Sequence, residues 1–169
     1  MFQVNDVIIY GAQGVCIITD IEEKTVNHVK KTYFVLKPVG DKGSTIFVPT
    51  DNELALRKMR RPLTKDEIHK LIDSMRSENA VWIANENERK ERYKNILAKG
   101  EHLELIKMVK AIYAHKKERE AEGKRLHMSD ERFFKDAEQI LYNEFQYVLD
   151  LGSKDDLINY IFDRLETNE

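Results

Sequence analysis

The chain contains a single cysteine, Cys16, among 169 residues. One cysteine excludes a disulfide framework within the chain and is typical of a reducing compartment, so we expect a cytoplasmic protein. Cys16 lies in the apolar run 15–18, which favours a buried structural thiol over a reactive one. The amino terminus lacks the basic segment and apolar core of a signal peptide. No apolar run approaches the roughly 18 residues that span a bilayer, so no membrane association is expected.

The sequence also lacks the familiar motifs of catalysis, nucleotide binding and metal binding. The stretch 40–45 has the composition of a phosphate-binding loop but not its spacing, and a hairpin turn is the better interpretation. No Cys-x-x-Cys or His-Glu-x-x-His pattern occurs, and the five histidines are scattered along the chain. These absences argue against an enzyme, and we expect no metal, cofactor or small-molecule substrate.

The first sixty residues carry the pattern of short β-strands. Apolar, β-branched runs separated by Gly, Asn and Pro predict four strands and a weaker fifth, over 7–10, 15–21, 32–36, 45–48 and 54–57. Pro49 has no amide hydrogen to give to a neighbouring strand, so the fourth strand should end there. Short strands with frequent turns predict a small antiparallel β-barrel.

After Pro62 there is no further proline, and apolar residues recur at helical spacing. Thr64 and Glu67 form a capping-box pattern at the start of the first predicted helix. The second helix is predicted to run from 79 or 81 to 99, where Gly100 ends it. Three more helices are predicted, beginning near residues 103, 129 and 153. Strands followed by helices predict an α+β protein, with a barrel domain at 1–61 and an all-α domain of about five helices at 62–169.

Charge is distributed unevenly along the helical part. Residues 87–125 carry twelve Lys/Arg and seven Asp/Glu, whereas residues 126–169 carry four and eleven. On a helix, Arg89, Arg92 and Tyr93 would share one face, with Trp82 two turns before Arg89. Such a face could follow a phosphate backbone and present a flat apolar edge to the bases.

An alternative interpretation needs no DNA. Trp82 and Tyr93 would be core anchors beneath a solvated charged face, and spacing alone favours this interpretation. A second basic cluster, which includes Lys124 and Arg125, lies at the end of the third predicted helix. There the simplest explanation is that the cations complement the helix dipole.

The order of these patterns resembles the CarD/CdnL family of RNA-polymerase-binding transcription regulators, over nearly the whole chain. The opening Phe2-Gln3-Val4-Asn5-Asp6-x-Ile8-Ile9-Tyr10, with Gly14 after it, is similar to the family's first barrel strands. The segments 33–37 and 45–49 resemble its third and fourth strands. In the helical part, Arg92-Tyr93-Lys94-x-x-Leu97-x-x-Gly100 is similar to a stretch of the family's second domain.

The resemblance implies a Tudor-like, SH3-like barrel at the amino terminus, shared with transcription-repair coupling factors. In the family this domain pairs with the β subunit of RNA polymerase, partly through a sheet edge, which agrees with an exposed edge strand in the predicted barrel. Phe47 stands at a basic position of the family pattern, so the contact is expected to be more apolar here, or shifted. The implied polymerase-binding residues are Lys24, Thr45, Ile46, Phe47, Val48 and Pro49.

The family's helical domain places a tryptophan as a wedge at the upstream edge of the opening promoter bubble, which stabilises the open complex. In this chain the corresponding position, four residues before Tyr93, holds Arg89. Three alternatives remain: Trp82 takes over the wedge, Arg89 enters the groove, or Trp82 is only core. The DNA contacts are expected to be weak and largely independent of base sequence, from Trp82, Arg89, Lys90, Arg92, Tyr93, Lys94, Lys124 and Arg125.

The expected function is therefore that of a transcription regulator, which binds the RNA polymerase β subunit through 1–61 and contacts promoter DNA through 62–169. A protein–protein adaptor that docks on polymerase without touching DNA is the first alternative. An enzyme with a site between the two domains is the second.

Overall fold

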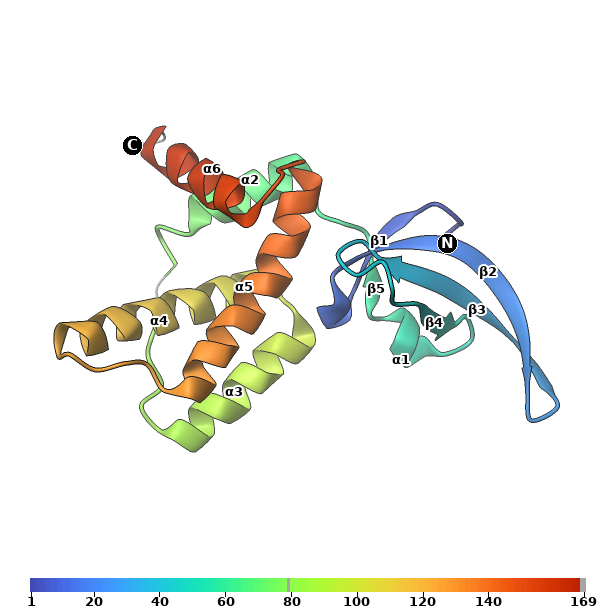
Figure 1. Cartoon of the computed structure of the whole chain (residues 1–169), viewed down its shortest axis with the longest axis horizontal. Helices are drawn as coiled ribbons and strands as arrows, with labels where there is room; N and C mark the ends of the chain where they lie inside the picture. The colour runs from blue at the N-terminus through green and yellow to red at the C-terminus, as the bar shows by residue number, and fades with distance from the viewer. Residues whose placement is uncertain (79, 168–169) are drawn as a thin grey trace. The chain divides into compact units, whose positions relative to one another are not determined.

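The computed structural model describes residues 1–78 and 80–167 (Figure 1). The chain divides into two compact units, Met1–Pro62 and Leu63–Glu169. Within the described ranges, every strand lies in the first unit and the regular elements of the second are helices, so the predicted α+β class is confirmed. Among the described residues, no helix is both long and apolar enough to cross a bilayer.

The N-terminal unit is an antiparallel sheet in the order β4-β3-β2-β1-β5. Its strands are β1 (Val7–Tyr10), β2 (Val15–Val26), β3 (Val29–Pro38), β4 (Ile46–Pro49) and β5 (Met59–Arg60). A short 3-10 helix, η1 (Gly11–Gln13), joins β1 to β2. The described strands do not close the sheet into a barrel, so β4 and β5 remain its two edges.

The predicted strand over 54–57 is wrong, because this stretch lies largely in a short helix, α1 (Glu53–Leu56). The Asn52 side chain accepts a hydrogen bond from the Ala55 amide at 3.1 Å and so caps the first turn. The edge strand next to β1 is instead β5, where Met59 and Arg60 pair with β1.

The inner face of the sheet carries the core of this unit. Alternate residues of β1, β2, β3 and β4 point inward, as a half-buried sheet requires. Cys16 is fully buried among them, as expected, and burial raises the pKa of its thiol to about 11. The buried cluster consists of Ile8, Cys16, Ile18, Phe34, Leu36, Val48 and Met59.

The C-terminal unit has the five helices that the periodicity predicts: α2 (Lys65–Ser74), α3 (Glu86–Lys99), α4 (His102–Ala121), α5 (Met128–Val148) and α6 (Lys154–Thr167). The capping box forms as predicted, since Thr64 Oγ1 accepts from the Glu67 amide and Glu67 Oε1 accepts from the Thr64 amide. Gly100 ends α3 with a left-handed φ of 66°. Leu105, Ile112 and Phe145 are fully buried at the centre of the helical core.

The predicted start of the second helix is wrong. Helix α3 begins at Glu86, because Asn85 caps it by accepting a hydrogen bond from the Glu88 amide at 3.0 Å. Residues 80–84 are irregular, and residue 79 lies outside the described residues. Trp82 is therefore not on α3, and it does not share a helical face with Arg89.

Candidate functional site

Strand β4 leaves one side of its backbone open. It pairs with β3 on its inner side only, and it forms the edge of the described sheet. Thr50 N donates to Thr32 O at 2.9 Å, which fixes the phase of the antiparallel ladder. Because hydrogen-bonded and non-hydrogen-bonded pairs alternate, Val48 bonds to β3, whereas the N–H and C=O of Phe47 point to the open edge. Phe47 is therefore the residue of β4 that offers both an N–H and a C=O to another strand.

The Phe47 side chain lies at the centre of a small surface cluster. Phe47 is 40% exposed, and the Lys24 Nζ lies 3.5 Å from its ring centroid. The Tyr33 ring meets it edge to face, with centroids 6.3 Å apart. The fold thus brings together Lys24 and Phe47, which are distant in sequence, beside the open backbone edge.

The other polymerase-binding candidates differ in what they can offer. Thr45 precedes β4 and is exposed, and Ile46 and Pro49 are partly buried. Val48 is completely buried in the core of the unit. Its side chain cannot touch a partner, so the structure removes Val48 from the candidate contacts.

Arg89 is buried, against the expectation that it meets DNA. Its Nε lies 2.9 Å from Asp130 Oδ1 and its second terminal nitrogen lies 3.1 Å from Oδ2, with side-chain exposures of 4% and 0%. The guanidinium also donates to the Ile83 carbonyl at 3.0 Å. Arg89 thus ties the 80–84 segment to α3 and α5, and it has no free surface for a phosphate.

Tyr93 is likewise placed in the interior rather than on an exposed face. It is 2% exposed and packs edge to face against Phe133, with ring centroids 5.6 Å apart. Burial raises the pKa of Tyr93 to about 12, and the nearby Asp130 carboxylate adds to this effect. For Tyr93, the alternative interpretation as a core anchor is the one that agrees with the structure.

Trp82 lies on the helical unit in a defined stack. Its ring is nearly parallel to the His115 ring of α4, at 3.7 Å between centroids and 9° between planes. The guanidinium carbon of Arg89 lies 4.4 Å from the indole centroid. Burial lowers the pKa of His115, and the Glu118 carboxylate partly opposes this shift. A partly buried indole is thus held in one orientation by an imidazole and a fixed cation.

Sequence reasoning missed the two residues that complete this cluster. Asp130 lies in the first turn of α5, where a carboxylate complements the helix dipole, and nothing local distinguishes such a carboxylate from a buried one. His115 is one of five histidines scattered along the chain, and its sequence position gives no sign of a ring partner. Only the packing of α4 and α5 against α3 reveals both roles.

The remaining DNA-binding candidates lie on the surface. Lys90 pairs with Glu86 at 3.0 Å, and Lys124 pairs with Glu122 at 3.6 Å. Lys94 and Arg125 are exposed. Two of these four cations, Lys90 and Lys124, are therefore paired with a carboxylate, which partly neutralises the positive charge of 87–125.

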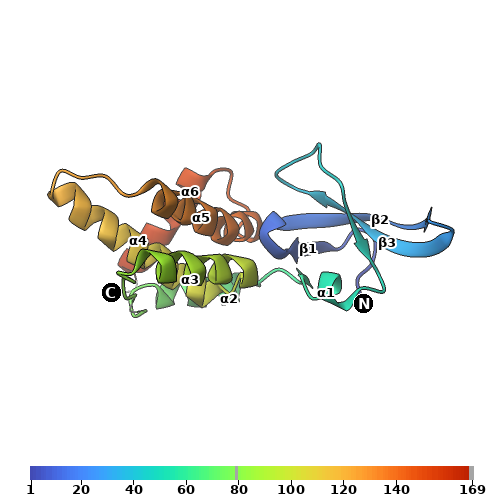
Figure 2. The same ribbon diagram turned by 90° about the horizontal axis from the view of Figure 1, so that it is seen from below.

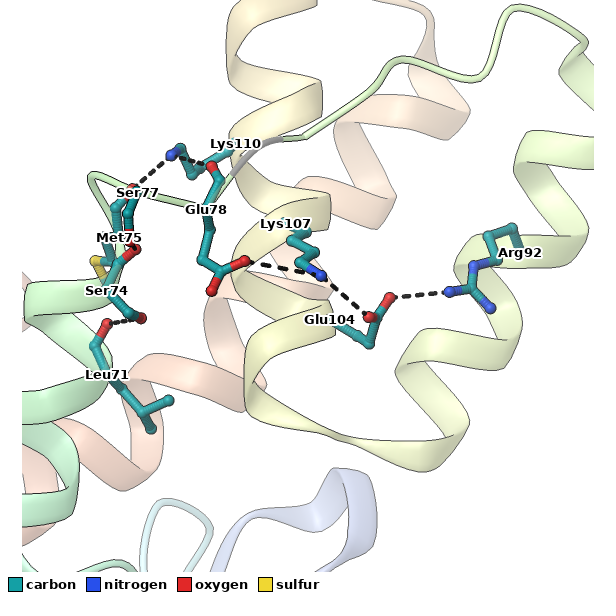
Figure 3. Close-up of polar contacts among 9 residues, drawn as sticks. All are labelled: Leu71, Ser74, Met75, Ser77, Glu78, Arg92, Glu104, Lys107 and Lys110. Atoms are coloured by element: carbon teal, nitrogen blue, oxygen red, sulfur yellow. Dashed lines mark hydrogen bonds and ion pairs between the residues drawn. The ribbon is translucent and has the colours of Figure 1, made fainter.

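Arg92 belongs to a chain of ion pairs that links three segments (Figure 3). Arg92 binds Glu104 at 2.9 Å, and Lys107 bridges Glu104 and Glu78, each at 3.7 Å. Lys110 donates to the carbonyl oxygens of Met75 and Glu78, just after α2. A cation at this place satisfies carbonyls that the end of a helix leaves free. Arg92 is therefore paired with Glu104, while 53% of its side chain stays exposed.

Two comparisons with known proteins bear on these sites. Residues 2–60 match the model of the CarD-like/TRCF RID domain. The chain is also 27% identical over 160 residues to the Bacillus subtilis (strain 168) protein named "Putative transcription factor YdeB", and the alignment covers 91% of this chain and 96% of that protein. The domain match includes β4 and the Phe47 cluster, and the second similarity extends through both units.

Proposed function

We propose that this chain is a transcription regulator that binds the β subunit of RNA polymerase through its N-terminal unit, because residues 2–60 match the model of the CarD-like/TRCF RID domain. The similarity to a protein named as a transcription factor, over 91% of the chain, supports a regulatory role for both units together. The observation that carries the polymerase half is the open edge of β4 beside the Phe47 cluster.

In this proposal a strand of the partner extends the sheet at β4. The outward N–H and C=O of Phe47 pair with that strand, and its ring packs against a partner side chain while Lys24 faces an acceptor. Each main-chain hydrogen bond contributes about 0.5–1.5 kcal/mol net. Pro49 supplies no N–H, so the shared ladder is short and the cluster beside it must add affinity.

The test is a pull-down of the polymerase β subunit with two variants of one residue. Phe47→Pro removes the outward N–H but not a bond to β3, whereas Phe47→Ala removes only the ring. We expect Phe47→Pro to abolish capture and Phe47→Ala to weaken it. Leu54→Ala is the control, because Leu54 is 73% exposed in the same unit but lies in α1. Wild-type capture by a folded Phe47→Pro protein, checked by circular dichroism, would remove edge pairing as the docking mode.

We further propose that the helical unit contacts promoter DNA through Trp82 and thereby stabilises the open complex. The stack with His115 and the cation of Arg89 fix the indole before it meets DNA, so little ordering cost remains. Docking on polymerase raises the local concentration of this site, so weak contacts are sufficient. A wedge that binds only melted DNA shifts the closed–open equilibrium by its differential affinity.

Open-complex lifetime tests this half of the function. Trp82→Ala should shorten the lifetime, whereas Tyr113→Ala, which removes a 49% exposed aromatic ring of α4, should leave it unchanged. If the lifetimes with Trp82→Ala and wild type agree while polymerase capture is intact, the chain is an adaptor without DNA contact.

A further inference from the structure

The β2–β3 hairpin extends beyond the rest of the sheet (Figures 1 and 2). Strand β1 pairs with β2 only at 15–17, and β4 pairs with β3 only at 33–36. Residues 24–31 therefore form a ribbon whose backbone pairs only with itself among the described strands. Every side chain from 25 to 31 is exposed. A lone two-stranded ribbon is only marginally stable in water, so its length needs an explanation other than packing.

The tip of this ribbon combines a well-formed turn with one unfavourable cross-strand pair. Asn27 and His28 both have positive φ, at 51° and 64°, which forms a tight turn that suits the strand twist. Asn and His are among the non-glycine residues that adopt this left-handed conformation most readily. Lys24 lies directly opposite Lys31, and like charges at such a pair are destabilising. A residue pair that destabilises its own strand pairing is expected where the surface serves binding.

Positive charge occurs on both faces of the tip. Directly paired residues share a face, so Lys31 lies on the face of the Val26–Val29 pair, and Lys30 lies with Thr25 on the opposite face. Residues 24–31 contain three lysines, one histidine and no Asp or Glu. Within residues 1–78 and 80–167, Lys30 and Lys31 form no ion pair. Val26 and Val29 are 49% and 53% exposed at the end of the ribbon.

We propose that the tip of the β2–β3 hairpin is a second nucleic-acid contact of this chain, which enters the major groove of duplex DNA. That groove is about 12 Å wide and admits a two-stranded ribbon. Phosphates flank it on both sides, which suits cations on both faces, whereas a protein surface would engage one face. The valine pair then meets apolar base edges such as the thymine methyl group. This contact is separate from Trp82 and lies on the other unit.

The salt dependence of binding tests the two lysines. The full chain would be titrated into a fluorescein-labelled 20-bp duplex between 50 and 200 mM salt, and anisotropy would be followed. Lys30→Gln/Lys31→Gln should lower the slope of log Kobs against log salt by about 1.8, because each lost phosphate contact contributes about 0.9. Wild type would then lose about 12-fold more affinity than the variant over this range. Lys37→Gln/Lys42→Gln is the control, since it removes the same charge from exposed positions outside the tip.

Equal slopes for the tip variant and the control would overturn the proposal, because general charge loss would then explain both. No polymerase is needed, so a failure here is distinct from a failure of docking at β4.

Site-directed crosslinking identifies what the tip touches. The native Cys16 is fully buried, so a cysteine-reactive benzophenone labels an introduced thiol selectively. Thr25→Cys places the label in the tip, and Gln13→Cys places it beyond the opposite end of β2. We expect DNA crosslinks from residue 25 but not from residue 13, both with free duplex and in the polymerase–promoter complex. Crosslinks from residue 25 to protein alone would show that the hairpin contacts protein instead of DNA, and the proposal would be wrong.

Discussion

Removal of the Asp130 carboxylate should strongly destabilise the helical unit. The Arg89–Asp130 pair has two short hydrogen bonds and almost no solvent exposure. Without Asp130, the guanidinium stays buried with only the carbonyls of the 80–84 segment as partners. Loss of one member of a buried ion pair costs about 3–5 kcal/mol, because the other charge is left uncompensated. We expect Asp130→Ala to lower the free energy of unfolding by about this amount.

The neighbouring residue provides a matched control. Glu131 is also in the first turn of α5, but its pair with Lys135 is at 4.0 Å and both side chains are mostly exposed. Exposed pairs contribute about 0–1 kcal/mol, so Glu131→Ala should have little effect. A double variant, Arg89→Met with Asp130→Leu, should recover much of the loss, because apolar replacement of a whole buried pair is often neutral or stabilising.

Urea unfolding followed by the fluorescence of Trp82 measures these changes. Trp82 is the single tryptophan of the chain and contacts Arg89, so its emission reports the helical unit. With an m-value of about 2 kcal/mol/M, the expected loss moves the midpoint by about 2 M. If Asp130→Ala and Glu131→Ala unfold within 1 kcal/mol of each other, the buried pair does not stabilise this unit in the way its geometry indicates.

Two further outcomes follow from the same unit. Burial lowers the pKa of His115, so below its ordinary value of 6.5 the unfolded chain binds the proton more readily and the helical unit loses stability as the pH falls. Trp82 emission should titrate with a midpoint below 6.5, and His115→Gln should abolish this transition; a midpoint above 6.5 would contradict the burial argument. Thr64→Ala should cost about 1 kcal/mol in urea unfolding through loss of the capping box, whereas Thr64→Ser should be near neutral.

Patterns of short range predict most of the fold. Strands β1 to β4 and the five helices of the second unit follow from apolar periodicity, and the capping box and Gly100 mark two helix ends. The wrong predictions, a strand over 54–57 and an early start of α3, occur where a capping side chain determines where a helix begins. Asn52 turns the 53–56 segment into helix, and Asn85 delays the start of α3, because each accepts a backbone amide that would otherwise be unsatisfied.

The candidate site is predicted less completely, because its contacts are long in sequence. Lys24 and Phe47 meet across two strand pairings, and Arg89 reaches Asp130 across 41 positions. A periodic pattern predicts which face of a helix a residue occupies, but it does not predict which two charged side chains form a buried pair. Arg89 therefore has the spacing of an exposed phosphate-binding residue while its partner lies two helices away.

Phe47 and Trp82, the two aromatic residues proposed as contacts, each lie against a cation, but the two cations differ in exposure. Lys24 is partly exposed beside Phe47, so it can also meet the partner, whereas Arg89 is buried behind Trp82 and can act only on the position of the indole. A lost phosphate contact lowers the salt slope of DNA binding by about 0.9. The double variant Arg89→Met/Asp130→Leu, which leaves no buried charge unpaired, should instead shorten the open complex with the slope unchanged. A fall in slope equal to one phosphate would mean that Arg89 leaves Asp130 and enters the groove.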